Sequence, residues 1–299
     1  MISVSVIIVS YNTRNLLQEC LRSVIRNTKD LDYEIIVVDN QSADGSIDMI
    51  RSGFPNVHLI ANTANHGFAK ANNQALAVAK GEYIFFLNPD TIVLNDALAQ
   101  LFSFCQSDSR IAVVGPRLYQ CYAREHHPSI RMFSQPILVI LSWLPFSRWI
   151  LYVHHYYIIR RNQIQDVDWL VGAAFMMPRR ILDKIGYFDE RYFVYSEEED
   201  LCLRAHKAGY RVVYYPPAEV VHLKGKSSEQ EPIQASRYFW ESKLAFFYKY
   251  YSSSRVKAFR WGFIKLIQFK KLYSSSHQRQ KYDQVIKIIS EYKKKNNGE

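Results

Sequence analysis

Three short apolar runs in the first third of the chain place the strongest limit on its fold. Residues 3–10 (SVSVIIVS), 33–38 (YEIIVV) and 83–87 (YIFFL) are apolar or small at almost every position. Strands of this composition are buried on both faces, as in a parallel sheet with helices on each side. Helical spacing over residues 14–27 follows the first run. This alternation predicts an α/β fold with a doubly wound, Rossmann-like, mostly parallel twisted sheet flanked by helices.

The second half of the chain is less regular. Its uncharged stretch at 132–147 has 16 residues, contains two prolines and is ended by Arg148, so it is too short and too interrupted for a membrane-spanning helix. We expect one domain over 1–232, with a first half at about 1–115 and a second at about 116–232. The other expected elements are helices over 46–52, 179–185 and 198–208, a helix from the Asn65 turn to Lys80, and strands over 57–61, 111–115, 167–177 and 211–215.

The segment 233–299 differs in charge from the rest of the chain. It contains 15 Lys and Arg against 4 Asp and Glu, which leaves 23 basic and 24 acidic residues for 1–232. Aromatic residues alternate with its cations, as in 237–240 (RYFW). Helices of this kind lie in a bilayer interface with Lys and Arg on anionic headgroups. The alternative is that the aromatic residues pack in a core and the charges face water. No groove-reading motif is present, so we do not expect nucleic acid as a partner.

The cysteines bear on the cellular compartment. All four are far apart in sequence and form no Cys-x-x-Cys pair, which argues against a zinc site or a disulfide framework and fits a reducing cytosol. The N-terminal residues enter a strand at once, so we expect no signal peptide and a cytoplasmic location.

Polar residues follow the predicted strands at the points where they end. Ser10-Tyr11-Asn12 follows the first run, and Asp39 follows the second. Pro89 ends the third run, because proline cannot donate to a sheet ladder, and Asp90 comes next. Open α/β sheets bind ligands beyond the carboxyl ends of their strands. Neither Gly-x-Gly-x-x-Gly nor a P-loop is present, which disfavours dinucleotide cofactors and P-loop chemistry. Turn and cap roles remain alternatives for both acids.

A divalent cation is expected beside Asp90. A carboxylate alone repels a diphosphate, whereas Mg²⁺ or Mn²⁺ binds one or two protein ligands together with the phosphates of a substrate. His222 is a candidate second ligand, and an ordinary loop-edge imidazole is the alternative. The loop Lys224–Ser228 (KGKSS) offers cations and amides to phosphate oxygens. Two histidine pairs, His126-His127 and His154-His155, are expected to be surface or interfacial pairs.

Four consecutive acids, Glu197-Glu198-Glu199-Asp200, are the most unusual local feature. Acids at a helix start are favourable for the helix dipole, so a stabilised helix N-terminus is one interpretation. Aromatic residues precede the four acids and Leu201-Cys202-Leu203 follows them, which indicates a packed location. A carboxylate near a cation-bound diphosphate and a bound hydroxyl is suited to act as a general base.

Together these motifs resemble the family 2 glycosyltransferases of the GT-A fold, and within them the bacterial rhamnosyltransferase-like branch. The resemblance covers about residues 3–228, with the motifs in order. They are SVIIVSYN at 5–12, VVDNQSADGS at 37–46, NHGFAKANN at 65–73, FLNPDT at 86–91, GAA at 172–174, GYFDE at 186–190, YSEEEDLCLR at 195–204 and HLKGKS at 222–227.

The resemblance implies an inverting transfer of a sugar from a nucleoside-diphosphate donor, such as dTDP-rhamnose or a UDP-sugar, to a hydroxyl of a glycan or lipid-linked acceptor. It places the base at Glu198, where the family usually has Asp, so Glu197 and Asp200 remain alternatives. It places the metal at Asp90, with Asn88 in the first position of the usual Asp-x-Asp. The predicted donor-binding residues are Ser10, Tyr11, Asn12, Asp39, Asp44, Asn65, Gly67, Phe68, Ala69, Asn72, Asn88, Lys224 and Ser227.

The second half of the domain is expected to hold the acceptor. Trp169 and Trp240 are candidates to stack on a sugar face, and core packing is the alternative for both. The predicted acceptor-binding residues are Trp169, Gly172, Tyr195 and Arg204. A lipid-linked acceptor would make membrane attachment useful, so we predict a peripheral protein on the cytoplasmic face of the inner membrane, attached through 233–299. One alternative is a sugar-phosphate nucleotidyltransferase, which has a similar sheet. Such an enzyme would need a Gly-rich, Arg-bearing loop after the first strand, where this chain has SYNTR at 10–14. A non-catalytic glycan- or membrane-binding module is the other alternative.

Overall fold

The computed structural model describes residues 2–120, 126–144, 162–223 and 232–292, so that Lys224 and Ser227 of the predicted donor site and the pair His154-His155 lie outside it. The chain divides into two compact units, here called the sheet unit and the helical unit. The sheet unit contains 1–133, 160–190 and 198–230, and the helical unit contains 134–159, 191–197 and 231–299.

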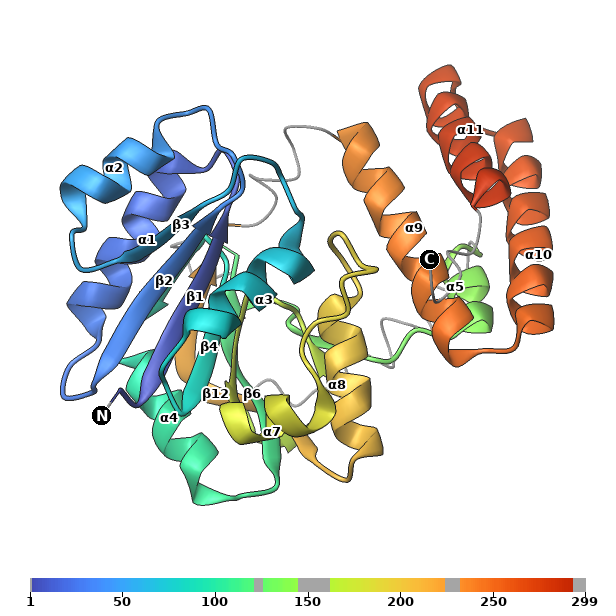
Figure 1. The fold of residues 1–299 in the computed structure, drawn as a ribbon. Helices are drawn as coiled ribbons and strands as arrows, with labels where there is room; N and C mark the ends of the chain where they lie inside the picture. Colours follow the sequence, from blue (N-terminus) through green and yellow to red (C-terminus); the bar gives the residue numbers. More distant parts are fainter. Residues whose placement is uncertain (1, 121–125, 145–161, 224–231, 293–299) are drawn as a thin grey trace. The chain divides into compact units, whose positions relative to one another are not determined.

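The strands of the sheet unit are β1 Val4–Ser10, β2 Tyr33–Asp39, β3 His58–Ala61, β4 Tyr83–Leu87, β5 Thr91–Leu94, β6 Ile111–Tyr119, β7 His126–His127, β8 Ile130–Arg131, β9 Gln165–Asp166, β10 Trp169–Leu170, β11 Ala174–Pro178 and β12 Arg211–His222. The main sheet has the order β3-β2-β1-β4-β11-β6-β12-β5, with β7 on β6 and β9 on β12 (Figure 1). The part from β3 to β4 is parallel, and β11 joins it antiparallel to β4. The predicted twisted α/β sheet is therefore confirmed. It is a mixed sheet, and its parallel part consists of β3, β2, β1 and β4.

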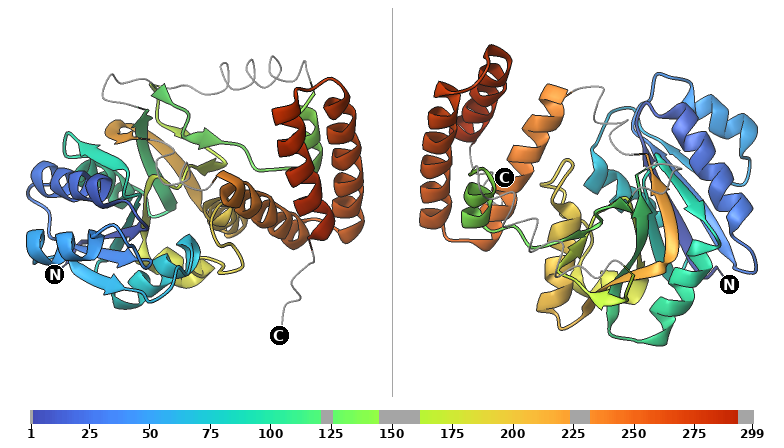
Figure 2. Two further views of the ribbon diagram at one scale, coloured as in Figure 1. Left: turned by 90° about the horizontal axis from the view of Figure 1, so that it is seen from above. Right: turned by 180° about the vertical axis from the view of Figure 1, so that it is seen from behind.

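The helices of the sheet unit are α1 Arg14–Asn27, α2 Ser46–Gly53, α3 Phe68–Val78, α4 Ala97–Ser107, α7 Arg179–Ile185 and α8 Glu197–Lys207. Helices α1 and α3 lie on opposite faces of the parallel strands (Figures 1 and 2). All seven residues of β1 are buried as a result, and the core joins Ile8, Leu17 and Leu21 of β1 and α1. Full burial of one such side chain contributes about 1.5–3 kcal/mol. The uninterrupted apolar runs in the sequence have this two-sided burial as their cause.

Several elements were not predicted, among them β5 and α4, and the strands β6 and β12 were predicted too short. Strand β5 follows directly after Asp90, and helix α4 buries Leu98, Leu101 and Cys105 on one face. Strand β12 does not end at Tyr215 but runs to His222, so the predicted boundary before the two prolines was wrong. The pairing of β12 with β6 shifts register between Tyr215 and Glu219, and this irregularity accommodates the prolines, which cannot donate to the ladder.

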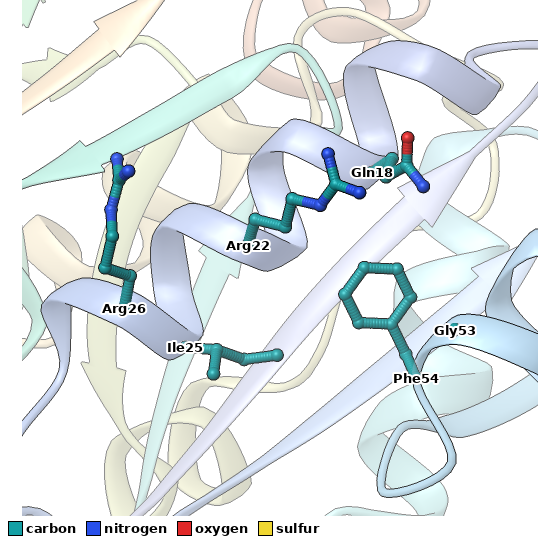
Figure 3. A pocket seen from close by; sticks show the side chains of 6 residues that line it. All are labelled: Gln18, Arg22, Ile25, Arg26, Gly53 and Phe54. Carbon is teal, nitrogen blue, oxygen red and sulfur yellow. The ribbon is translucent and has the colours of Figure 1, made fainter.

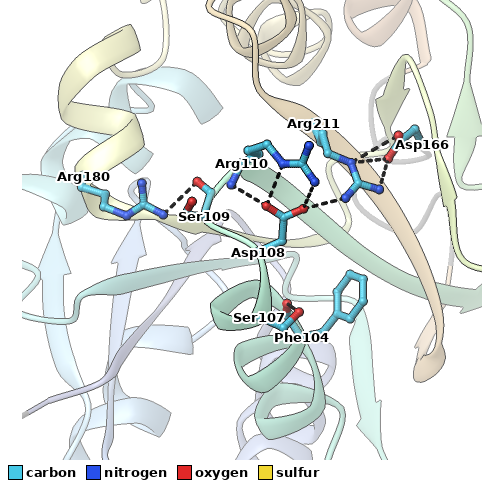
Figure 4. Close-up of polar contacts among 8 residues, drawn as sticks. All are labelled: Phe104, Ser107, Asp108, Ser109, Arg110, Asp166, Arg180 and Arg211. Atoms are coloured by element: carbon cyan, nitrogen blue, oxygen red, sulfur yellow. Dashed lines mark hydrogen bonds and ion pairs between the residues drawn. The ribbon is translucent and has the colours of Figure 1, made fainter.

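An ion cluster joins the starts of β6 and β12, at the end of the sheet away from Asp39 and Asp90. Asp108 contacts Arg110 at 2.9 Å and Arg211 at 2.8 Å, and Arg211 also contacts Asp166 at 2.8 Å (Figure 4). Hydrogen bonds from Arg110 hold the pKa of the Asp108 carboxyl well below its usual range. The cluster fixes the turn between α4 and β6 and takes no part in the ligand edge of the sheet.

The helical unit consists of α5 Pro136–Ser142, α9 Pro232–Tyr250, α10 Ser253–Leu272 and α11 Ser276–Glu291. Aromatic residues fill its interior: Phe263 packs against Trp143 and Trp240, each at a ring distance of 5.0 Å, and stacks with Phe259 at 5.3 Å. Trp240, a candidate from the sequence for stacking on a sugar face, is therefore a core residue. No described helix is long and apolar enough to cross a bilayer.

Candidate functional site

The carboxyl ends of β1 and β2 form a rigid ligand edge. Ser10 pairs with Asp39 in the parallel register, and both side chains are fully buried. Asn12 has a left-handed backbone (φ 51°); its amide donates to Ser42 Oγ and its Oδ1 accepts from the amide of Ala43, both at 2.8 Å. Asp39 Oδ1 accepts from the amide of Ser42 at 2.8 Å. Its Oδ2 is buried and has no hydrogen-bond partner among the described residues, so this acceptor needs a donor that the described residues do not supply.

Asp44, a predicted donor-binding residue, has a local structural role. Its carboxylate accepts from the amide of Arg14 at 2.7 Å, at the start of α1, and from the hydroxyl and amide of Ser46, at the start of α2. Partial burial alone would raise the pKa of Asp44, but the hydrogen bonds from Ser46 and Arg14 outweigh it and lower the pKa. Asp44 thus caps two helix N-termini, where negative charge is favourable.

The predicted segment 65–73 turns into α3 beside this edge. Asn65 Oδ1 accepts from the amide of Gly67 at 3.0 Å, and Gly67 has a φ of 79°, which favours glycine. Asn72 is buried and donates to Phe68 within its own helix at 2.9 Å, and Ala69 is buried as well. The structure therefore gives Asn72 and Ala69 packing roles, whereas Tyr11 is 38% exposed and accessible to a ligand.

Asp90 lies beside His222, as the sequence predicts for the metal site. The register of β5 and β12 pairs Thr91 with His222, and this brings Asp90 Oδ1 within 3.3 Å of His222 Nε2. Both side chains are buried. His222 Nδ1 is also buried and has no partner among the described residues. No group of three or more His, Cys, Asp or Glu close enough to hold a metal occurs within the described parts of the chain. The structure brings together the two residues that the sequence predicts as metal ligands, Asp90 and His222.

His127 is a residue of this site that was not identified from the sequence. Its expected position in a surface or interfacial pair was wrong: its side chain is 2% exposed, and its ring lies 5.2 Å from that of His222. Strand β7 turns back onto β6 and places His127 opposite Leu118.

The four acids differ in accessibility. Glu197, Glu199 and Asp200 are buried, and only Glu198 of the four is partly exposed. Asp200 forms an ion pair with Arg204 at 2.8 Å, one turn along α8. Arg204 also donates to the carbonyl oxygens of Ile185, Gly186 and Tyr187 at 2.6–2.7 Å. Asp200 and Arg204 therefore tie α8 to the segment after α7, and the guanidinium of Arg204 is fully used in this contact.

Glu198 lies against the start of β11. A Cβ added at Gly172 would be 3.4 Å from Glu198 Oε1, so the glycine brings the backbone into contact with the carboxylate. The amide of Asn88 donates to the carbonyl of Ala173 at 2.9 Å, and Leu87 pairs with Ala174. Asp90 is two residues from Asn88, so this short chain of contacts connects Asp90 to Glu198. Glu198 therefore lies near the carboxyl end of β4, which Asn88 and Asp90 follow.

A half-buried guanidinium, Arg131, accompanies Glu198 and was not predicted. Arg131 lies on β8, opposite Trp169 of β10. Burial lowers the pKa of the Arg131 guanidinium, and the negative charge of Glu198 partly opposes that shift, so the two groups interact. Trp169 donates through Nε1 to the carbonyl of Met132 at 2.8 Å, which fixes its indole plane next to this pair.

The segment before Glu198 belongs to the helical unit. Tyr195 and Ser196 both have left-handed backbones, with φ of 71° and 67°. Each such non-glycine residue costs roughly 1–2 kcal/mol and needs support from its surroundings. Helix α9 supplies it: Phe193 stacks on Tyr238 at 4.3 Å, Tyr195 packs edge-on to Phe239 at 5.8 Å, and Ser242 donates to the carbonyl of Val194 at 2.8 Å.

A hollow of about 490 Å³ over the outer face of α1 and the end of α2 is distinct from this site (Figure 3). None of the predicted site residues lines it. Its lining residues are Gln18, Arg22, Ile25, Arg26, Gly53 and Phe54.

Comparison with known proteins agrees with this geometry. The sequence profile of glycosyl transferase family 2 matches residues 5–186. The chain belongs to this family. It is 30% identical to rhamnosyltransferase WbbL of Escherichia coli (strain K12), over 82% of this chain and 92% of that protein. It is 28% identical to N-acetylglucosaminyl-diphospho-decaprenol L-rhamnosyltransferase of Mycobacterium tuberculosis, over 76% of this chain and 78% of that protein. The chain is thus a family 2 glycosyltransferase of the rhamnosyltransferase-like branch.

Solved structures confirm the GT-A fold. The mannosyltransferase PcManGT of Pyrobaculum calidifontis, in complex with GDP-Man and Mn²⁺, superposes with a TM-score of 0.59 at 17% identity, over 96% of this chain and 84% of that one. GalNAc-T7, with UDP, GalNAc and Mn²⁺, superposes with a TM-score of 0.58 at 16% identity, over 88% and 55%.

Proposed function

We propose that this family 2 glycosyltransferase performs an inverting transfer of rhamnose, or a similar sugar, from a dTDP- or UDP-sugar to an acceptor hydroxyl, with Glu198 as the general base. The observation that carries the proposal is the position of Glu198. Of the four consecutive acids, Glu198 alone is partly exposed. It lies against Gly172, just before β11, and β11 pairs with β4, the strand that precedes Asp90. Glu197, buried, and Asp200, paired with Arg204, are less suited to receive a proton from a bound acceptor.

A divalent cation fits the residues at Asp90. Asp90 Oδ1 and His222 Nε2 lie side by side, and the buried imidazole has one nitrogen without a partner among the described residues. Two protein ligands and the phosphates of a donor are a usual set for Mg²⁺ or Mn²⁺. When bound, the cation supplies positive charge that stabilises the departing diphosphate.

The residues of the chain perform the other tasks. Asp39 accepts from the base of the nucleotide, and Tyr11 covers it. The acceptor oxygen forms a bond to the anomeric carbon, its proton passes to Glu198, and the bond to the diphosphate breaks with its electron pair on the leaving oxygen. The positive charge of Arg131 interacts favourably with the Glu198 carboxylate before the transfer. Alignment of the two substrates contributes on the order of 7 kcal/mol to such a reaction.

The relatives support the nature of the substrates. One is named for rhamnosyl transfer to N-acetylglucosaminyl-diphospho-decaprenol, so we propose a lipid-linked acceptor for this chain and a role in cell-surface polysaccharide synthesis. Such an acceptor places the enzyme at the cytoplasmic face of a membrane, with peripheral attachment through 233–299. The family match leaves little support for a nucleotidyltransferase or a non-catalytic module.

Replacement of the base tests the proposal. Rhamnose transfer from dTDP-rhamnose to N-acetylglucosaminyl diphosphate on a short polyprenyl chain is measured for the wild type and for Glu198→Gln. We expect kcat to fall at least about 1,000-fold, because the amide accepts no proton. The thermal shift given by dTDP with Mn²⁺ should stay unchanged, since Glu198 does not contact the donor nucleotide. Full activity in Glu198→Gln would show that another residue is the base.

A further inference from the structure

Helix α10 is apolar on two faces, and among the described residues one of them is buried and the other exposed. Val256, Phe259, Phe263 and Ile267 are buried and face the interior of the helical unit. On the outer face, the side chains of Trp261, Phe269, Leu272 and Tyr273 are 69%, 59%, 66% and 81% exposed. A surface helix with a single core-facing stripe does not need a second set of large apolar side chains.

The outer face has a regular composition. Lys257, Trp261, Lys265, Phe269 and Tyr273 follow one another at intervals of four residues, so they form one continuous ridge along the helix. Both lysines are exposed, like the aromatic residues between them. The ridge, with the adjacent Leu272, is here called the α10 ridge. Aromatic and cationic side chains thus alternate along one line of the surface.

The charge of α10 distinguishes the possible occupants of the ridge. The helix contains six Lys and Arg and no Asp or Glu. Arg260, Lys270 and Lys271 are used inside the unit: Arg260 donates to the carbonyl of Ile289 at 3.0 Å, Lys270 to that of Trp143 at 2.9 Å, and Lys271 pairs with Asp283. Lys257 and Lys265 point outward and give the ridge a positive charge.

The neighbouring helix α11 provides an internal comparison. It buries Val285 and Ile289 against the unit. No exposed large hydrophobic side chain occurs on it among the described residues, whereas α10 has three and Tyr273 follows directly. The exposure of apolar groups is therefore a property of the α10 ridge and not of the basic C-terminal segment as a whole.

We propose that the α10 ridge docks on the surface of an anionic lipid bilayer. Trp, Phe, Tyr and Leu enter the boundary between headgroups and acyl chains, and lysines at intervals of one turn meet the phosphates. A second copy of the chain fits less well, because a contact between two such ridges brings two sets of lysines together and α10 has no acidic side chain to balance them. A single convex helix ridge also has no groove for a nucleic-acid strand. The inference rests on the proposed function, because a lipid-linked acceptor is the reason for the enzyme to bind a membrane. Its test needs neither donor nor acceptor.

The experiment is flotation of the full-length protein with vesicles of phosphatidylcholine, with and without about 30% phosphatidylglycerol. We expect the wild type to float with the anionic vesicles and at least about tenfold less with the neutral ones. Trp261→Ser/Phe269→Ser should reduce binding at least about tenfold. Lys257→Glu/Lys265→Glu should reduce vesicle binding at least about 25-fold. Each lysine near an anionic surface contributes about 1 kcal/mol, which is roughly fivefold in affinity, and the two factors multiply. Thermal unfolding confirms that each variant is folded, which the exposure of these side chains favours.

A matched control separates the ridge from overall charge. Lys281→Glu/Lys287→Glu on α11 changes the net charge by the same amount at two exposed positions and should lower binding less than about threefold. Equal losses in both lysine pairs, or no flotation of the wild type, would overturn the proposal. Two other results with the Trp261→Ser/Phe269→Ser variant would also overturn it, if vesicle binding were unchanged. One is the loss of a dimer that the wild type forms, and the other is the loss of tight binding to an oligothymidylate. Release of dTDP from dTDP-rhamnose, measured without vesicles, reports on the proposed function separately.

Discussion

Substitution of Gly172 provides a graded test of the position of the base. A Cβ at this position lies 3.4, 3.5 and 3.6 Å from the Oε1, Cδ and Cγ atoms of Glu198, which is ordinary van der Waals contact. Gly172→Ala therefore fits without movement. Valine adds two methyl groups about 1.5 Å beyond Cβ, and one of them overlaps the carboxylate.

The backbone at Gly172 has little freedom to retreat from this overlap. The amide of Val171 donates to the carbonyl of Ser129 at 2.8 Å, and the carbonyl of Ala173 accepts from Asn88 at 2.9 Å. The Asp200–Arg204 pair holds α8 in place. The side chain of Glu198 must therefore shift, by on the order of 1 Å. A misplacement of this size costs about 100-fold in rate, or about 2.7 kcal/mol in the barrier.

The assay is kcat and KM for rhamnose transfer by wild type, Gly172→Ala and Gly172→Val. We expect Gly172→Ala to retain activity within about threefold, and Gly172→Val to lose about 100-fold in kcat with an unchanged KM for dTDP-rhamnose. Gly53→Ala is the control, because a Cβ there meets no atom within 4 Å. If Gly172→Val kept its kcat, the contact with Glu198 would have no part in catalysis and the proposed base would be wrong.

Three further predictions concern charge, metal and packing. Arg131→Met should move the acid limb of the kcat/KM profile to higher pH, because the positive charge that interacts with the Glu198 carboxylate is then absent, whereas Arg131→Lys should leave the limb in place. Asp90→Asn should remove the Mn²⁺-dependent part of the thermal shift given by dTDP, while the exposed Asp48→Asn on α2 retains it, and an unchanged Mn²⁺ response in Asp90→Asn would exclude Asp90 as a ligand. Gly81→Ala should destabilise the fold by about 3 kcal/mol in urea unfolding, because its Cβ would lie 2.4 Å from the backbone nitrogen of Ser5; normal stability would mean that this β1–β4 approach is looser than described.

The parallel half of the sheet could be predicted because each strand there is buried on both faces, and this produces apolar runs that are visible locally. Helix α4 was missed although Leu98, Leu101 and Cys105 follow helical spacing, and β5 was missed because Pro89 was taken as the end of sheet pairing in this region. Beyond Pro89 the chain forms a new pairing with β12, more than 120 residues away, as the partners Thr91 and His222 illustrate.

The residues of the candidate site also divide into those that a local pattern predicts and those that depend on distant pairing or on hydrogen bonds. Asp90 and His222 were predicted from their places after strands, and their contact at 3.3 Å agrees with that. His127 and Arg131 reach the site through pairings with β6 and β10, which no local pattern in the sequence reveals. Asp44 and Arg204 were assigned to ligands from their motifs, yet both are used in hydrogen bonds that hold backbone in place. Motif membership identified the neighbourhood of these residues but not whether each faces the ligand or the scaffold.

The assignment of residues 191–197 to the helical unit affects how this enzyme can be divided or recombined. The two left-handed residues that lead into Glu198 depend on Tyr238, Phe239 and Ser242 of α9 for their support. A shortened protein ending near residue 232, or a chimera that exchanges the C-terminal helices with those of a relative, would keep every catalytic side chain and still release the strained turn. Exchange experiments aimed at acceptor choice should therefore move α9 together with 191–197 as one piece.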